Sequence, residues 1–310
     1  MARDNKFCSI LLLFFVICAV SDGLLVTLLS FSGRPNVWWH VPDNHQLMAD
    51  IKSNLTDARN RQATLTLSSI PPRLGYKGLV IGFGELAVGA ESKKLQLVLL
   101  NSIPDNLLPA AYINRMKREV DQVEPFNGGG DGGDGGGGGG GIDGGGGGAA
   151  KIGDKRKKGP FIRKKRLVLD YNPFIWNLFP IVLFNNCYNY ANNKMTHTFA
   201  QPGRGSGAMY AGITGALVET AAVNDGLRVI ADPQVPDKSL DFVVALVVEP
   251  NVDFHWYVLN RRGRWSHKPG QTFAINWDNA GAPINNVRAC NMGNYQFRSY
   301  MATNYGTTIQ

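Results

Sequence analysis

The chain has 310 residues, more than the roughly 100–200 of one ordinary domain, so its length predicts two modest domains and a connector. Its hydrophobic content of 44% is ordinary for a globular protein. The formal net charge is +8, which by itself favours anionic partners. Nine Lys or Arg side chains, however, lie between Lys151 and Arg166. The charge therefore does not indicate specific nucleic acid recognition by the folded parts.

Residues 1–23 have the three parts of a secretory signal peptide. A short basic region ends at Lys6, an apolar run extends from Phe7 to Val20, and small or polar residues follow at 21–23. Cleavage there predicts a secreted, extracellular protein with no stable membrane span. The alternative is an N-terminal signal anchor in a membrane, because residues 24–29 resume the apolar character.

The first half, residues 24–126, is predicted to be a small α+β domain or propeptide. The predicted strands are 24–31, 74–81 and 95–100, and the predicted helices are 47–58 and 112–123. The sequon Asn54-Leu55-Thr56 predicts a glycan on Asn54. This half resembles uncharacterised proteins only and indicates no activity.

Residues 127–166 form a Gly-rich and then basic linker, which we predict to be disordered. Seventeen of the 21 residues from Gly128 to Gly148 are glycine, and they offer no side chains for a core. The run Arg163, Lys164, Lys165 and Arg166 resembles a furin-type processing site. It implies a proprotein convertase as partner and a mature second half beginning near Leu167. The alternative is a solvated basic run that contacts anionic polymers.

The second half, residues 167–310, is predicted to be α+β, with helices followed by an antiparallel meander. An irregular aromatic stretch at 171–180 precedes helices at 185–191 and 208–224. The predicted strands are 242–248, 254–259, 264–268 and 273–277, divided by Pro- and Gly-containing turns.

Three side chains of this half form a candidate catalytic group. Cys187 follows two asparagines at a predicted helix start, where the helix dipole favours a thiolate. His255 opens a strand of the meander and could act as its base. His267 lies twelve residues later, across a hairpin, and could orient the imidazole of His255. Asn276 and Asp278 are alternatives for that orienting role.

These residues resemble the papain-like NlpC/P60 and CHAP amidases. The segment Asn186-Cys187-Tyr188-Asn189-Tyr190-Ala191 is similar to that around the CHAP nucleophile. Residues 255–267 are similar to the His strand, Gly turn and third-residue strand of NlpC/P60. The resemblance implies an NlpC/P60-like fold in which Cys187 is the nucleophile, His255 the base and His267 the orienting residue.

The sequence thus predicts a secreted cysteine amidase or peptidase. It would cleave a peptide or peptidoglycan-type amide through a thioester intermediate, without cofactor or metal. The alternative is a non-catalytic extracellular binding or matrix protein. In it Cys187 would form a disulfide with Cys290. An aromatic surface would then recognise glycan or protein, through Trp256, Tyr257, Trp265 and Trp277.

Overall fold

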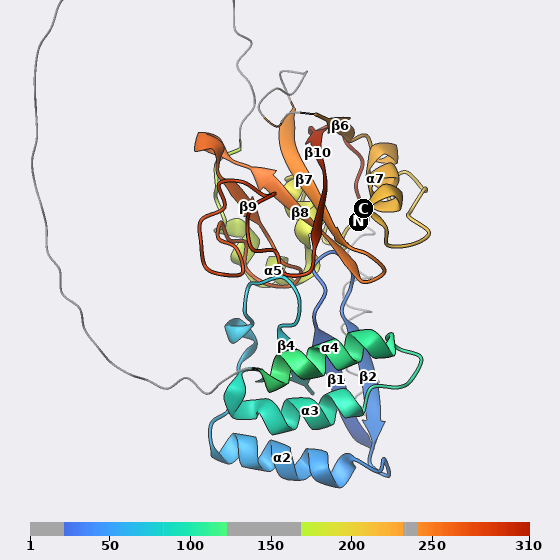
Figure 1. Cartoon of the computed structure of the whole chain (residues 1–310), viewed down its shortest axis with the longest axis vertical. Helices are drawn as coiled ribbons and strands as arrows, with labels where there is room; N and C mark the ends of the chain where they lie inside the picture. Colours follow the sequence, from blue (N-terminus) through green and yellow to red (C-terminus); the bar gives the residue numbers. More distant parts are fainter. Residues whose placement is uncertain (1–21, 83, 123–168, 232, 234–240) are drawn as a thin grey trace, which may run out of the picture. The chain divides into compact units, whose positions relative to one another are not determined.

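The computed structural model describes residues 22–82, 84–122, 169–231, 233 and 241–310 (Figure 1). Residues 1–21 of the predicted signal peptide and the whole predicted linker, with its processing site, lie outside the described residues. Within the described part, no helix combines the length and apolar character that a membrane crossing needs.

The N-terminal part, residues 22–122, is one antiparallel sheet with helices. Its strands are β1 (Gly23–Leu29), β2 (Val37–Pro42), β3 (Thr64–Leu65), β4 (Gly78–Ile81) and β5 (Glu85–Ala87), and its α-helices are α2 (Met48–Asn60), α3 (Lys93–Asn101) and α4 (Ala110–Asp121). The strand order is β2-β1-β4-β5-β3. The predicted strand at the start and the two predicted helices are confirmed at β1, α2 and α4.

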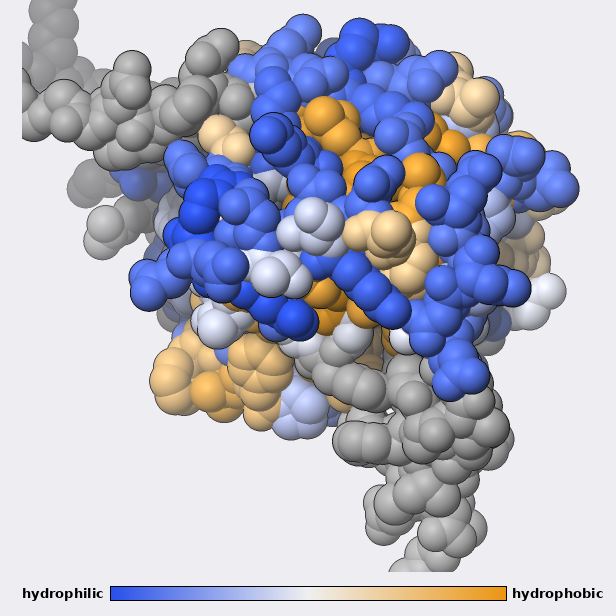
Figure 2. Space-filling model, turned by 90° about the horizontal axis from the view of Figure 1, so that it is seen from below, coloured by the Kyte–Doolittle hydropathy of each residue, from blue (hydrophilic) through white to orange (hydrophobic). Residues whose placement is uncertain are grey.

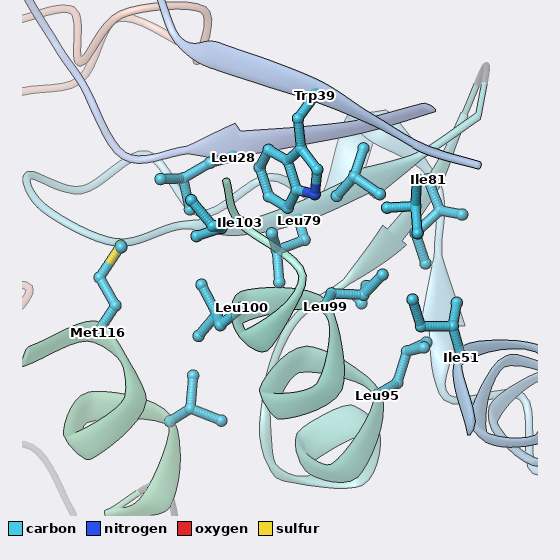
Figure 3. Close-up of a cluster of buried hydrophobic side chains, with 14 of the residues drawn as sticks. Leu28, Trp39, Ile51, Leu79, Ile81, Leu95, Leu99, Leu100, Ile103 and Met116 are labelled. Atoms are coloured by element: carbon cyan, nitrogen blue, oxygen red, sulfur yellow. The ribbon is translucent and has the colours of Figure 1, made fainter. Parts of the chain in front are cut away.

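The core of this part lies between the sheet and its helices (Figure 3). Trp39 of β2 and Leu79 of β4 point toward Leu99 of α3, and Met116 approaches from α4. The Trp39 indole N–H donates to Ser102 Oγ, 3.0 Å away, so its polar edge is satisfied inside the core. Seen from below the view of Figure 1, the described surface is mostly hydrophilic, with apolar atoms limited to a few areas (Figure 2).

The predicted strand at 95–100 is wrong, because these residues belong to helix α3. A short apolar run suits a buried strand or a buried helix equally well. Within α3 the buried positions include Leu95, Leu99 and Leu100, four and five residues apart, which is the spacing of one helix face. Residues 95–100 form a helix and not a strand because the surrounding helices and the sheet bury that face.

The C-terminal part, residues 169–310, is a second antiparallel sheet with short helices. Its strands are β6 (Arg228–Ile230), β7 (Phe242–Glu249), β8 (Asp253–Leu259), β9 (Trp265–His267) and β10 (Gln296–Thr303), and its α-helices are α5 (Ile181–Phe184), α6 (Cys187–Ala191) and α7 (Gly215–Asn224). The strand order is β6-β10-β7-β8-β9. The α+β class predicted for the chain is thus confirmed.

Strand β7 has a separate hydrophobic core on each face, and all eight of its residues are buried. Val244, Leu246 and Val248 join one core, whereas alternate residues such as Val243 and Val247 join the other. A strand covered on both faces is continuously apolar, which explains why the sequence predicted β7 correctly.

The predicted meander is correct for β7, β8 and β9 but incomplete. Residues 273–277 form isolated bridges instead of a strand, and α7 begins at Gly215 rather than at residue 208. Strand β10 was not predicted, although it pairs with both β6 and β7. Gln296, Arg298 and Ser299 interrupt its apolar pattern. The segment is therefore extended because it pairs with neighbouring strands, and its own sequence does not predict a strand.

Candidate functional site

Helix α6 places Cys187 at its first turn, because Asn186 caps the helix. The Asn186 side chain accepts hydrogen bonds from the backbone N–H of Tyr188 and Asn189, at 3.0 and 3.1 Å. The Asn186 N–H in turn donates to Asn189 Oδ1, at 3.1 Å, which completes a capping box. The prediction of a helix beginning at this cysteine is therefore confirmed.

Strands β8 and β9 bring His255 and His267 together. Tyr257 lies opposite His267 in the register of these two strands, and His255 precedes Tyr257 by two residues, on the same face. His255 Nε2 lies 2.8 Å from His267 Nδ1. His267 Nε2 lies 2.9 Å from the carbonyl oxygen of Trp277. The twelve-residue spacing thus does place the two rings in contact.

The Trp277 carbonyl determines which ring nitrogens of His267 and His255 carry a proton. A carbonyl only accepts, so His267 carries its proton on Nε2 and accepts on Nδ1. His255 must then donate from Nε2. Its Nδ1 has no hydrogen-bond partner within the described structure. The alternatives Asn276 and Asp278 do not orient His255, since Asp278 accepts instead from the backbone N–H of Ala280 and Ala282.

Burial keeps all three candidate side chains uncharged. Cys187, His255 and His267 are at most 1% exposed. Burial, with a smaller effect of Asp253, raises the pKa of the Cys187 thiol well above its usual value, although backbone hydrogen bonds from Trp256 and Tyr188 oppose this. Burial lowers the pKa of His255 well below its usual value and that of His267 to about 4. A buried neutral thiol is not the thiolate that attacks an amide. His255 is not placed as its base either, because it lies on the face of β8 opposite the core that holds Cys187.

A loop of the N-terminal part, residues 31–34, packs against the start of β8. The Asp253 carboxylate accepts the backbone N–H groups of Ser32, Gly33 and Arg34, the last at 3.0 Å, and the hydroxyl of Tyr295 at 2.6 Å. The Gly33 carbonyl in turn accepts from Asn186 Nδ2 at 2.8 Å. The loop therefore bonds to the residues that flank both His255 and Cys187.

Two fully buried lysines, which sequence reasoning missed, lie in the same region. Lys268 Nζ donates to the carbonyl oxygens of Val182, Asn185 and Gly270, at 2.6–2.7 Å. Lys77 Nζ donates to the carbonyls of Ser30 and Gly75, at 3.0 and 3.2 Å. Burial lowers the pKa of each lysine to about 7. Nothing in the local pattern around a single lysine signals such a role, because the acceptors come from distant segments.

Both cysteines of the described residues are free thiols, which corrects the expected Cys187–Cys290 disulfide. Cys290 Sγ lies 3.2 Å from the Val287 carbonyl oxygen. The glycan- or protein-binding surface expected from four aromatic residues is also wrong at three of its four positions. Trp256, Tyr257 and Trp265 are buried, whereas Trp277 is 42% exposed.

Asn54 lies on α2, where its Nδ2 donates to the Asp50 carbonyl at 2.8 Å, and its glycosylation stays a prediction. No group of three or more His, Cys, Asp or Glu side chains in the described ranges is arranged to hold a metal ion.

Fold and site together define an α+β protein with two antiparallel sheets, in which Cys187, His255 and His267 are buried and uncharged. The two histidines are in contact, but Cys187 belongs to the core that contains Trp256, whereas His255 lies on the opposite face of β8, with Tyr257. No protein-family model matches the chain, and no solved structure matches it. The chain is 46% identical over 125 residues to "Insoluble matrix shell protein 1" of Ruditapes philippinarum. The match covers 40% of this chain and 82% of that protein. The chain belongs to the family of this shell matrix protein.

This membership overturns the enzyme interpretation. The relative is named as a shell matrix protein and not as a hydrolase. The predictions of a thiol amidase or peptidase, of a peptide or wall-type substrate and of a convertase partner are therefore wrong. The suggested contact of the basic run with anionic polymers depended on residues 151–166, which lie outside the described residues. The non-catalytic alternative is the one that the relative favours.

Proposed function

We propose that this protein is a non-catalytic structural component of an extracellular matrix of the shell type. The observation that carries the proposal is the 46% identity to insoluble matrix shell protein 1, which extends over 82% of that protein. The burial of Cys187 is consistent with this role, because a fully buried thiol does not meet a substrate amide. The loop at residues 31–34 bonds to Asp253 and to Asn186, the residue before Cys187.

Fractionation of the source organism's mineralised tissue tests the proposal. After decalcification in dilute acid, mass spectrometry should find peptides of both described parts in the acid-insoluble residue. Their presence only in soluble secretions would overturn the proposal. The same spectra should contain no peptide from residues 1–20, because secretion requires removal of the signal. An intact N-terminus starting at Met1 would support the signal-anchor alternative.

Hydrolysis assays provide the second test. The secreted protein and its Cys187→Ala variant should show the same background rate on wall peptides and model amides, with Cys290→Ala as the matched control. A rate lost only in Cys187→Ala would contradict a non-catalytic role.

We also propose that the C-terminal part shares the arrangement of NlpC/P60 and CHAP amidases without their chemistry. The support is that α6 packs against β8 and that His267 follows on the neighbouring strand. An experimental structure of this protein should superpose α6, β8 and β9 on the corresponding elements of such an amidase. A different order of these elements in space would contradict the shared arrangement.

A further inference from the structure

The C-terminal part exposes a cluster of large apolar side chains from two segments, 171–181 and 269–277. We call the cluster the aromatic surface, and its members are Phe174, Ile175, Leu178, Phe179, Phe273 and Trp277. Each is between 37% and 69% exposed. Single exposed apolar residues are ordinary, but several on neighbouring segments mark an interaction site.

Hydrogen bonds hold the two segments against each other. Ala274 N–H donates to Asn177 Oδ1 at 2.7 Å, and the Tyr171 hydroxyl donates to the Ala274 carbonyl at 3.2 Å. These bonds fix Ala274, which follows Phe273, beside Asn177, which lies three residues after Phe174 and two before Phe179. The aromatic rings are therefore presented from one ordered backbone framework.

Neither segment contains an Asp, Glu, Lys, Arg or His residue. The polar side chains of the two segments are amides and hydroxyls, namely Tyr171, Asn172, Asn177, Gln271, Thr272 and Asn276. The charged residues next to the segments are Asp170, which is paired with Arg261, and the buried Lys268 and Asp278. The six apolar side chains therefore have no charged residue within their own segments, which suits a partner that is itself neutral rather than mineral ions, nucleic acid or anionic lipid.

A cavity of about 240 Å³ adjoins the aromatic surface at Ile175, which belongs to both. Amide side chains line it at Asn172, Asn193 and Asn260, beside the ring of Trp176. The one carboxylate of its lining, Asp170, is paired with Arg261 at 2.6 Å, so the lining is close to neutral. Apolar rings with a few amide groups are typical of sites for small neutral ligands.

We propose that the aromatic surface binds a neutral polysaccharide, with one sugar unit entering the adjoining cavity. Sugar rings present apolar C–H faces, which pack on aromatic rings, and hydroxyl groups, which hydrogen-bond to amides. This inference names a partner class for the proposed matrix component. A second copy of the chain is the competing occupant, and the experiment below distinguishes the two.

Retention on insoluble polymers tests the proposal. The mature full chain is incubated with cellulose and with chitin, two neutral polymers, and with alginate beads as the anionic comparison, at 0.1 and 1 M NaCl. We expect retention on at least one neutral polymer that is unchanged at high salt, because no charge contributes. Retention on alginate should disappear at 1 M NaCl.

The matched variants are Phe174→Ala with Trp277→Ala, one change in each segment, and Met209→Ala with Leu217→Ala as the exposed apolar control. The first pair should weaken retention at least about tenfold, while the control pair leaves it unchanged and both keep the native circular dichroism spectrum. No retention on either neutral polymer, or equal retention of both pairs, would overturn the proposal.

Analytical ultracentrifugation of the same proteins completes the test. The wild type should sediment as a monomer without polymer. Self-association that disappears in Phe174→Ala with Trp277→Ala would show instead that a second copy occupies the surface, and would overturn polysaccharide binding. A protein found in the acid-insoluble residue that fails to bind either neutral polymer would contradict this inference alone and leave the proposed function standing.

Discussion

His255 donates from Nε2 to Nδ1 of His267 over 2.8 Å, and His267 donates in turn to the Trp277 carbonyl. Both rings are buried, so this chain of hydrogen bonds lies inside the protein and not on a cleft wall. Protonation of His267 would remove the lone pair that accepts from His255. This arrangement of protons therefore requires both imidazoles to be neutral.

The first prediction concerns this pair at acid pH. Burial lowers the pKa of His267 from 6.5 to about 4, so the native state binds fewer protons than the unfolded chain between these values. The contribution of His267 to the free energy of unfolding should be fully present above pH 6.5, fall as the pH drops to about 4, and fall no further below that. At about 1.4 kcal/mol per pKa unit, His267 accounts for about 3 kcal/mol.

Urea titrations at pH 7.5, 6, 5 and 4 measure this loss. His267→Gln should flatten the decline by about that amount, whereas the exposed His40→Gln should follow the wild type. Parallel curves for wild type and His267→Gln would show that His267 is not the titrating group.

The second prediction concerns cysteine reactivity. Cys187 is fully buried with a raised pKa, whereas Cys290 is partly exposed and burial raises its pKa to about 11. Under native conditions at pH 8, iodoacetamide should label Cys290 at least about ten times faster than Cys187. Peptide mapping gives both rates, and in 6 M guanidinium they should become equal. Faster native labelling of Cys187 would indicate an accessible thiolate.

The third prediction concerns Asp253. Asp253→Asn replaces one carboxylate oxygen by an NH₂ group, which cannot accept from the N–H groups of the loop at residues 31–34 or from Tyr295. Because buried donors lose their acceptor, the free energy of unfolding should fall by about 3 kcal/mol. The exposed Asp105→Asn is the control in urea denaturation. A loss below about 0.5 kcal/mol would mean that the loop does not depend on this carboxylate.

The fourth prediction concerns the close approach of Gly33 to β8. A Cβ at position 33 would lie 2.4 Å from the Phe254 ring and 2.5 Å from the Phe254 carbonyl oxygen. The backbone oxygen cannot rotate away, so Gly33→Ala should destabilise the fold by about 2 kcal/mol. Gly84→Ala, where an added Cβ meets nothing within 4 Å, should change little. Equal thermal midpoints for the two variants would contradict the packing of this loop.

The fifth prediction concerns Lys268. Lys268→Met keeps most of the side-chain volume but removes the ammonium that bonds three buried carbonyls. The free energy of unfolding should fall by about 2–4 kcal/mol in denaturant titrations, because those carbonyls lose their donor. The exposed Lys94→Met is the matched control. Unchanged stability of Lys268→Met would show that other groups or water satisfy the carbonyls.

The pattern of neighbouring residues was sufficient to predict much of the fold. The apolar spacing of α2 and α4, the unbroken apolar run of β7 and the turn between β8 and β9 are properties of neighbouring residues, and the sequence alone determined them. The twelve-residue spacing of His255 and His267 across that turn likewise predicted their contact. The contact of the two histidines therefore followed from the sequence, although the chemistry inferred for them and for Cys187 did not.

Only the tertiary structure decided what this group can do. Asp253 meets the Gly33 N–H across 220 positions, and Lys268 meets the Val182 carbonyl across 86. Contacts between residues so far apart in the sequence cannot be predicted from the spacing of neighbouring residues. These contacts close the region around Cys187, and burial then removes the charge that a thiol nucleophile needs. The sequence determined which reactive groups are present, and long-range packing decided that they are enclosed and neutral.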